Sequence, residues 1–232
     1  MLDCPRVARE LPENSRLMNP SKRHCSHPRP YHHGDLHRTL VRAAENLLEE
    51  RGASGVSLRE VCQCAGVSHA APYRHFRDKA ALMEAVAQAG FEQLGQMIRE
   101  ARESHPGDPV SQLRDAGIAY VLWATDNPER TRLMFGGMMK SEDIDENLHE
   151  TAEAAYAEIY QIIDEGRQSC VFAGPSTETV VLSCWASVHG LTMLILGTRK
   201  LSPETKQEIR SLAAAVCDTI LAGIAARKRE TL

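Results

Sequence analysis

The sequence predicts an all-α protein of about nine helices, with an N-terminal three-helix domain of helix-turn-helix type and a larger C-terminal helical domain. Three observations carry this prediction. Apolar residues recur at spacings of three and four from residue 35 onward. The chain after residue 109 has no strand-like alternation. Gly66 separates two helical patterns at a position that needs a positive φ.

The composition is that of an ordinary soluble globular protein. The 232 residues allow one or two domains, and 43% of them are hydrophobic and 25% charged. The seven cysteines lack the clustered spacing of a secreted disulfide framework or a zinc finger. We therefore expect reduced, buried thiols, and neither a metal nor a cofactor.

Residues 1–33 are predicted to form a flexible basic arm, because they are rich in Pro, Arg and His and show little apolar periodicity. They lack the continuous apolar core of a signal peptide, and acids interrupt a transit-peptide pattern. Met18 is an alternative start. Residues 34–80 are then the helix-turn-helix domain, and residues 81–232 the second helical domain.

The first helix is predicted from Asp35 to Arg51, with Gly52 after its end. It braces the helix-turn-helix. Its apolar stripe consists of Leu36, Leu40, Ala43, Ala44, Leu47 and Leu48. Arg38 and Arg42 lie on the opposite side, where a solvated face is favoured over a phosphate contact.

The helix-turn-helix covers residues 57–79. Ser57 and Glu60 form a capping box that opens its first helix, and Gly66 ends that helix. Ser68 is predicted as the N-cap of a second helix. Pro72 lacks the amide that should bond to the Ser68 carbonyl, so we expect an irregular first turn.

The second helix has the features of a DNA-reading element. Its first turn contains His69, Ala70 and Ala71, and this end normally contacts base edges. The two alanines present only methyl groups and therefore allow close approach to a groove. Tyr73 and Phe76 are three residues apart. One aromatic ring can therefore pack into the domain core while a neighbouring side chain points its polar tip at a phosphate. Lys79 lies just inside the next helix, where the helix dipole adds to its attraction for phosphate.

The charge distribution agrees with a DNA contact in the N-terminal part. The net charge of the chain is −4, yet residues 1–79 carry 13 Lys and Arg against 9 Asp and Glu, while residues 80–232 carry 14 against 22. The basic arm could also lie along the minor groove, although a solvated tail is favoured.

The run GVSHAAPYRHFRDKAAL at residues 66–82 resembles the DNA-binding domain of the TetR (tetracycline-repressor-like) family. The residues that carry the resemblance are Gly66, Val67, Ser68, Tyr73, Phe76, Lys79 and Leu82. It implies phosphate contacts from Tyr73, His75 and Lys79, and base contacts near Ser68, His69 and Ala70. The candidate DNA-binding set is Ser57, Ser68, His69, Ala70, Tyr73, Arg74, His75 and Lys79.

Helices are predicted throughout the second domain. A long connector, opened by the Asp78 cap, ends near Ser104, and Gly90 and Gly95 favour a bend in it. The further helices are Val110 to Asp126, Pro128 to Phe135, Ile144 to near Cys170, residues 179–197, and a last helix opened by Ser202 and Pro203, with a loop at residues 136–145.

Residues 179–197 carry no formal charge and are long enough to span a membrane. Polar residues interrupt them and the chain has no second candidate, so a helix buried on most sides in a core or dimer interface is favoured over a membrane partner. The last two helices are the candidate homodimer interface. The resemblance implies that they pair with the same two helices of a second chain and form a four-helix bundle. The pattern of Trp185, Val188, His189 and Gly190 resembles the C-terminal domain of one branch of the family.

Aromatic and methionine side chains of the second domain are candidates for an apolar effector pocket. They are Trp123, Met134, Phe135, Met138, Met139, Tyr156, Tyr160, Trp185 and His189. The same residues also fit a plain hydrophobic core, which is the favoured interpretation, with His189 as a hydrogen-bonded core histidine.

The resemblance implies a ligand-responsive transcriptional regulator in the cytoplasm, a repressor that binds a palindromic double-stranded DNA operator as a homodimer and responds to a small-molecule effector. A regulator without an effector, or an activator, is the alternative. An enzyme using His189 and Cys184, with His149, is a remote alternative, because the sequence has no HExxH, GxSxG or nucleotide-binding glycine motif. The operator, target genes and effector stay open.

Overall fold

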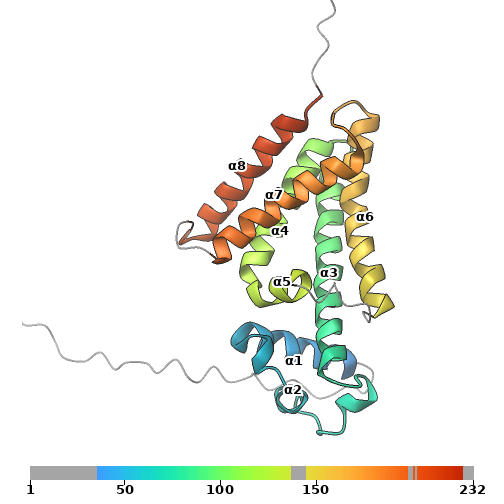
Figure 1. Ribbon diagram of the computed structural model, residues 1–232, viewed down its shortest axis with the longest axis vertical. Helices are drawn as coiled ribbons and strands as arrows, with labels where there is room; N and C mark the ends of the chain where they lie inside the picture. Colours follow the sequence, from blue (N-terminus) through green and yellow to red (C-terminus); the bar gives the residue numbers. More distant parts are fainter. Residues whose placement is uncertain (1–35, 137–144, 198–200, 202, 227–232) are drawn as a thin grey trace, which may run out of the picture.

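The computed structural model describes residues 36–136, 145–197, 201 and 203–226, and these ranges form eight α-helices and two short 3₁₀-helices, without a β-strand. The order is α1 (Leu36–Arg51), η1 (Ala53–Gly55), α2 (Leu58–Ala65), η2 (Pro72–Arg74), α3 (Lys79–Ser104), α4 (Pro109–Asp126), α5 (Pro128–Phe135), α6 (Glu146–Gln168), α7 (Thr177–Gly197) and α8 (Lys206–Ile224). The all-α prediction is confirmed for these ranges. In Figure 1, α1 and α2 form a small unit at the base, from which α3 rises into the larger bundle.

The small unit has its own hydrophobic core, made by α1, α2 and the first turns of α3. Leu40, Leu47, Val61 and Val86 are each at most 1% exposed in it. A second core begins at Ala87 and extends to α8. The two cores therefore meet inside α3, which belongs to both.

Local capping sets the ends of α2, as the sequence predicts. The Ser57 hydroxyl accepts from the Glu60 amide at 3.3 Å and donates to the Glu60 carboxylate at 2.7 Å. Gly66 closes the helix with a φ of 67°, which side-chain-bearing residues rarely adopt. The predicted capping box and glycine stop are confirmed.

The predicted second helix of the helix-turn-helix is wrong as an α-helix. Residues 68–71 form turns, and the helical part is the three-residue 3₁₀-helix η2. The Ser68 carbonyl accepts from Ala71, three residues on, because Pro72 has no amide to offer it. The irregularity expected at Pro72 thus spreads over the whole segment, and the described part of the chain contains eight α-helices against about nine predicted.

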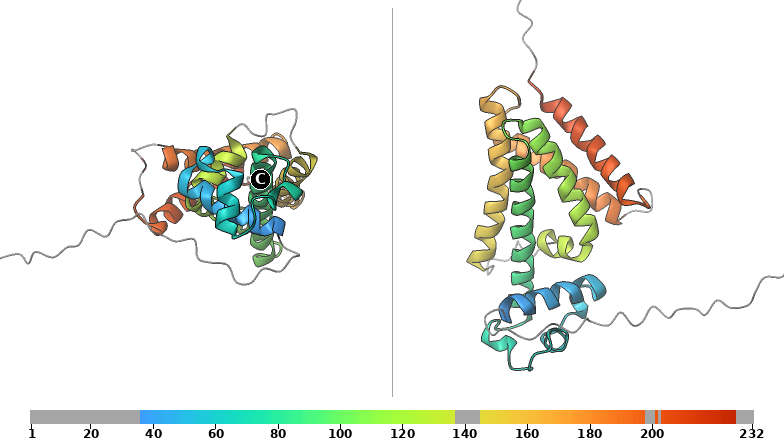
Figure 2. Two further views of the ribbon diagram at one scale, coloured as in Figure 1. Left: turned by 90° about the horizontal axis from the view of Figure 1, so that it is seen from below. Right: turned by 180° about the vertical axis from the view of Figure 1, so that it is seen from behind.

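Helix α3 runs between α4 and α6 (Figure 2) and has the predicted ends. The Asp78 carboxylate caps its start by accepting from the Ala81 amide at 2.9 Å. Its Gly90 lies against Met134, whose sulfur would be 2.4 Å from a Cβ at this position. A side chain at this position would therefore displace the buried Met134 side chain.

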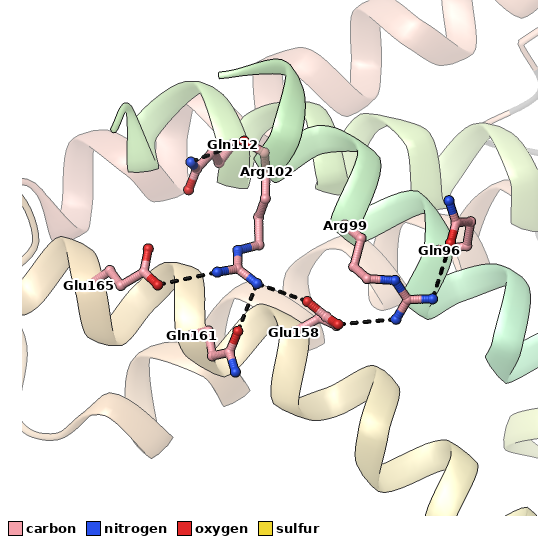
Figure 3. A network of polar contacts seen from close by, with 7 residues as sticks. All are labelled: Gln96, Arg99, Arg102, Gln112, Glu158, Gln161 and Glu165. Carbon is pink, nitrogen blue, oxygen red and sulfur yellow. Dashed lines mark hydrogen bonds and ion pairs between the residues drawn. The ribbon is translucent and has the colours of Figure 1, made fainter. Parts of the chain in front are cut away.

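A polar network joins α3 to α6 (Figure 3). Arg99 and Arg102 each contact the Glu158 carboxylate at 3.0 Å, and Arg102 also reaches Glu165 at 3.2 Å. The buried Gln112 of α4 donates to the carbonyls of Arg102 and His105, at 3.3 and 2.8 Å, at the end of α3. These contacts fix the far end of α3 in the bundle.

Of two predicted helix boundaries in the C-terminal part, one needs correction. Helix α6 ends at Gln168, close to the predicted end near Cys170, and Cys170 has a φ of 58°. Helix α8 begins at Lys206, because the Thr205 hydroxyl accepts from the Glu208 amide at 3.2 Å and so provides the N-cap. Pro203 precedes this cap. Ser202 and most of the predicted loop at 136–145 lie outside the described residues.

Helix α7 is less buried than the sequence predicts. It is long and apolar enough to cross a membrane by length and composition, a test that core helices of soluble proteins also pass. In this chain 33% of its apolar window is buried, and Leu182 and Leu194 are 63% and 50% exposed. Within one chain α7 is therefore not buried on most sides, and its burial in a dimer interface stays a prediction.

Candidate DNA-binding surface and effector cavity

The segment after α2 presents most of the candidate DNA-binding residues on one exposed surface. Two inward residues, Pro72 and Phe76, hold the segment to the small core, and Phe76 is 3% exposed. Between and before them the side chains reach solvent, and Tyr73 is 63% exposed. The exposed candidates are Ser68, His69, Ala70, Tyr73, Arg74 and His75. The exposed candidate side chains thus flank the two buried residues that hold the segment to the small core.

The remaining two candidates have structural contacts. Ser57 is half-buried, and its hydroxyl is engaged in the α2 capping box. The Lys79 ammonium donates to the Ala53 carbonyl at 2.7 Å, which leaves two of its three N–H groups available at the N-terminus of α3. Lys79 therefore ties η1 to α3 and keeps a positive charge at the dipole's positive end.

His75 is positioned by aromatic neighbours. Its ring lies edge-on to His37 at 5.9 Å, and the His37 ring packs on Phe76 at 4.8 Å. These contacts link the exposed segment to the first turn of α1. Substitution of His75 therefore changes both a candidate phosphate contact and a packing contact.

The larger core contains a cavity of about 270 Å³. Helices α3, α4, α6, α7 and α8 and the end of α5 surround it. Its lining is mainly aliphatic and aromatic: Phe91, Leu94, Ile98, Leu113, Ala116, Gly117, Tyr120, Phe135, Ala152, Glu153, Ala155, Tyr156, Ile159, Val181, Cys184, Trp185, Val188, Cys217, Ile220 and Leu221. Of the candidate effector residues, Phe135, Tyr156 and Trp185 contribute to this wall.

The other described candidates have different positions. Trp123 donates to Gln93 at 3.0 Å, Met134 is fully buried against Gly90, and Tyr160 donates to Glu178 at 3.2 Å. These three are not among the residues that line the cavity. Met138 and Met139 lie outside the described residues.

His189 stands behind the cavity wall. Its Nδ1 shares a 2.7 Å hydrogen bond with the Tyr120 hydroxyl, and its ring stacks on Trp185 at 5.2 Å. Burial lowers the pKa of His189 and raises that of Tyr120, so both are neutral at pH 7. His189 is thus a hydrogen-bonded support for two wall residues.

Sequence reasoning missed several wall residues, among them Tyr120, Glu153 and Cys217. Tyr120 and Cys217 lie in regular apolar patterns that fit any helical core, and no local motif distinguishes them. Burial raises the pKa of the Cys184 and Cys217 thiols to about 11. They are protonated at pH 7 and therefore poor nucleophiles, which argues against the catalytic role considered for Cys184. Within the described residues, no group of three or more His, Cys, Asp and Glu could hold a metal ion.

A charged junction joins the small unit to the core. Arg130 at the start of α5 is 8% exposed and contacts Glu45 of α1 at 2.9 Å and Asn127 at 2.6 Å. The Glu49 carboxylate of α1 accepts from the amides of Glu129 and Arg130, at 3.1 and 2.9 Å. Helix α1 thereby caps the N-terminus of α5, and Phe135 at the other end of α5 lines the cavity.

The described residues form an all-α fold with a small N-terminal unit and a core domain that contains a cavity. Two family models agree: residues 40–86 match the bacterial regulatory proteins of the tetR family, and residues 113–220 match the tetracyclin repressor-like C-terminal domain. The chain belongs to the TetR family and is a DNA-binding transcriptional regulator. TetR-family regulators are soluble proteins that bind DNA operators and small-molecule effectors and act as dimers.

Curated relatives give the same class. The chain is 35% identical over 95 residues to the HTH-type transcriptional regulator AcrR of Shigella flexneri, which covers 41% of this chain and 44% of AcrR. It is 36% identical over 98 residues to the HTH-type transcriptional repressor BepR of Brucella suis biovar 1 (strain 1330), covering 41% of this chain and 46% of BepR. The matched region therefore spans less than half the length of these two relatives.

Solved structures extend the similarity to the core domain. A protein of unknown function from Rhodococcus sp. RHA1 has a TM-score of 0.74 at 31% identity, covering 85% of this chain and all of that chain. The TetR-family regulator PfmR of Thermus thermophilus has a TM-score of 0.62 at 20% identity, covering 79% of this chain and 97% of PfmR. At that identity the likeness to PfmR concerns the fold alone.

Proposed function

We propose that this regulator is a repressor that binds a palindromic operator as a homodimer in the cytoplasm and releases it when a small molecule enters the core cavity. One observation carries the proposal: α3 belongs to both sites. Its first residue, Lys79, belongs to the candidate DNA-binding set, and Phe91, Leu94 and Ile98 line the cavity. A ligand that displaces the middle of α3 would also move the surface at its start.

The exposed face of α7 and α8 supports dimerisation. Leu182 and Leu194 of α7 are unusually exposed for leucines, and open space surrounds Gly190 and Gly223. A two-fold dimer through these helices would place two DNA-binding surfaces in successive major grooves, about 34–36 Å apart. A Leu182→Arg variant should sediment as a monomer and bind operator DNA much more weakly, whereas Leu182→Met should stay dimeric.

Release requires that the effector bind the DNA-incompetent arrangement better than the DNA-bound one. A typical coupling free energy between two such sites is about 1–3 kcal/mol. The charged junction offers a second connection, besides α3, between the cavity and the small unit. Phe135 of α5 lines the cavity, and the N-terminus of α5 contacts Glu49 of α1.

The first experiment is selection of DNA from a random pool by the purified protein at a stated salt concentration, because phosphate contacts make affinity strongly salt-dependent. We expect a two-fold symmetric sequence. A His75→Ala and Lys79→Ala double variant should then bind this sequence at least tenfold more weakly, by loss of two phosphate contacts.

The matched control is Arg132→Ala, which removes an exposed charge of α5 outside the DNA-binding surface. Circular dichroism must show that the double variant keeps its helices, because Lys79 also contacts Ala53. Unchanged affinity of a folded double variant would contradict the assigned surface.

A further inference from the structure

The cavity wall carries one formal charge. Among the residues that line it, Glu153 of α6 is the sole acidic or basic residue, and it is exposed. Tyr156, one turn further on α6, is 44% exposed and also lines the cavity. Because both reach solvent, the carboxylate and the phenol mark the mouth, while the interior is apolar.

Nothing in the described part of the chain neutralises Glu153: the structure shows neither an ion pair nor a hydrogen bond for its carboxylate there. The two guanidinium groups of α3 that reach α6 contact other carboxylates: Arg99 pairs with Glu158, and Arg102 pairs with Glu158 and Glu165 (Figure 3). Helix α6 as a whole carries six acidic residues and one Arg. The Glu153 carboxylate therefore places an unpaired negative charge at the mouth within the described residues.

This combination selects ligands by charge. An anionic group at the mouth would be repelled, and a neutral polar group would gain little. A positive group would be attracted both by the carboxylate and by the faces of aromatic rings such as those of Tyr156 and Trp185. The interior, in contrast, requires an apolar body.

We propose that the effector is an apolar organic cation whose hydrocarbon body fills the cavity and whose positive group lies at the mouth beside Glu153 and Tyr156. The proposal rests on the proposed function, because it names the class of molecule that the cavity takes. An amine or quaternary ammonium group on an aromatic or alkyl body has this chemistry.

The test uses three probes of similar size and different charge: 6-phenylhexyl-trimethylammonium, its neutral isostere with a tert-butyl group in place of trimethylammonium, and the anionic 8-phenyloctanoate. Isothermal titration calorimetry at low salt should give an affinity about tenfold higher for the cation than for the isostere, and lower still for the anion. The cation should also release operator DNA.

A charge-removing variant ties this preference to one residue. Glu153→Gln should reduce the preference for the cation about threefold, because an exposed charge pair is weak. Glu150→Gln removes an exposed charge one turn earlier on α6, outside the cavity wall, and should leave the preference unchanged. In a Trp123→Phe background Trp185 is the remaining tryptophan of two, so quenching of its fluorescence would place the probe in the cavity.

The outcomes separate the two proposals. Equal or tighter binding of the isostere or the anion, with Trp185 quenching and DNA release, would overturn the cationic class and leave the effector cavity in place. An unchanged preference in Glu153→Gln would overturn the role of Glu153. Failure of all three probes to quench Trp185 or to release DNA would overturn the cationic class and contradict the cavity as the effector site.

Discussion

The small unit and the larger core use the same kind of helices in opposite ways. In the small unit, side chains such as Leu47 and Val61 fill the space between α1, α2 and the start of α3. In the larger core, the helices surround a cavity, and polar contacts such as the α3–α6 network support its walls. One end of α3 therefore belongs to a filled body and the other to a body that encloses a cavity.

The largest expected difference concerns leucine truncation in the two regions. Leu47→Ala in the filled unit should lower the free energy of unfolding by about 4 kcal/mol, because a fully buried side chain leaves a new void. Leu94→Ala at the cavity wall should cost about 2 kcal/mol, because its side chain already has fewer neighbours on one side. Urea denaturation followed by circular dichroism measures both, and equal costs would contradict the comparison.

The charged junction between the regions gives the next effect. Arg130→Met should cost about 3 kcal/mol, because Glu45 loses the ion pair that offsets its burial. Burial already raises the pKa of Glu45, and Arg130 opposes that rise. Because its pKa is raised, Glu45 destabilises the fold when it is ionised. The loss of stability caused by Arg130→Met should therefore be largest at neutral pH, and it should become smaller as Glu45 is protonated in acid.

Two controls isolate this pair. Glu45→Gln in the Arg130→Met background should recover most of the loss, since it removes the unpaired buried charge. Arg132→Met, on the exposed side of the same helix, should change stability by less than about 0.5 kcal/mol. A loss that persists in the double variant would assign the effect to packing rather than charge.

A smaller effect is expected from the local cap in the small unit. Ser57→Ala should lower stability by about 1 kcal/mol, because the Glu60 amide loses its acceptor. Ser57→Asp, which keeps an acceptor at this position, should cost less. An equal loss of stability in Ser57→Ala and Ser57→Asp would contradict the capping role of this acceptor.

The smallest effect should come from His189 in the larger core. Burial lowers its pKa, so the unfolded chain takes up a proton before the folded one as the pH falls below about 6.5. Stability should therefore decrease between that pH and the lowered folded-state pKa, and His189→Gln should flatten this part of the profile. Thermal melts at pH 5 to 7.5 measure it, and an identical slope in both proteins would contradict the assignment.

What can be predicted from the sequence follows the same division. Ser57, Gly66 and Asp78 act through backbone groups within three or four residues, so their roles can be read from the chain. Pro72 is recognisable as irregular, but the loss of the whole α-helical segment depends on how its neighbours share the remaining hydrogen bonds.

The cavity depends on side chains that are far apart in sequence. Tyr120 and His189 meet across 69 positions, and Glu153 reaches the mouth only because α6 packs beside α3. Apolar periodicity predicts that such helices pack, but it does not tell a filled interface from a hollow one. The sequence therefore allowed candidate pocket residues to be chosen only by residue type. Three of these candidates, Phe135, Tyr156 and Trp185, line the cavity.

The short turn-and-3₁₀ segment after α2 has a consequence for the evolution of this regulator. Its architecture depends on the inward residues Pro72 and Phe76, while the outward positions His69, Ala70 and Tyr73 make little contribution to the fold. Within the proposed role, these outward positions can diverge rapidly after gene duplication. A descendant could acquire a new operator while retaining the inherited scaffold and its sensor.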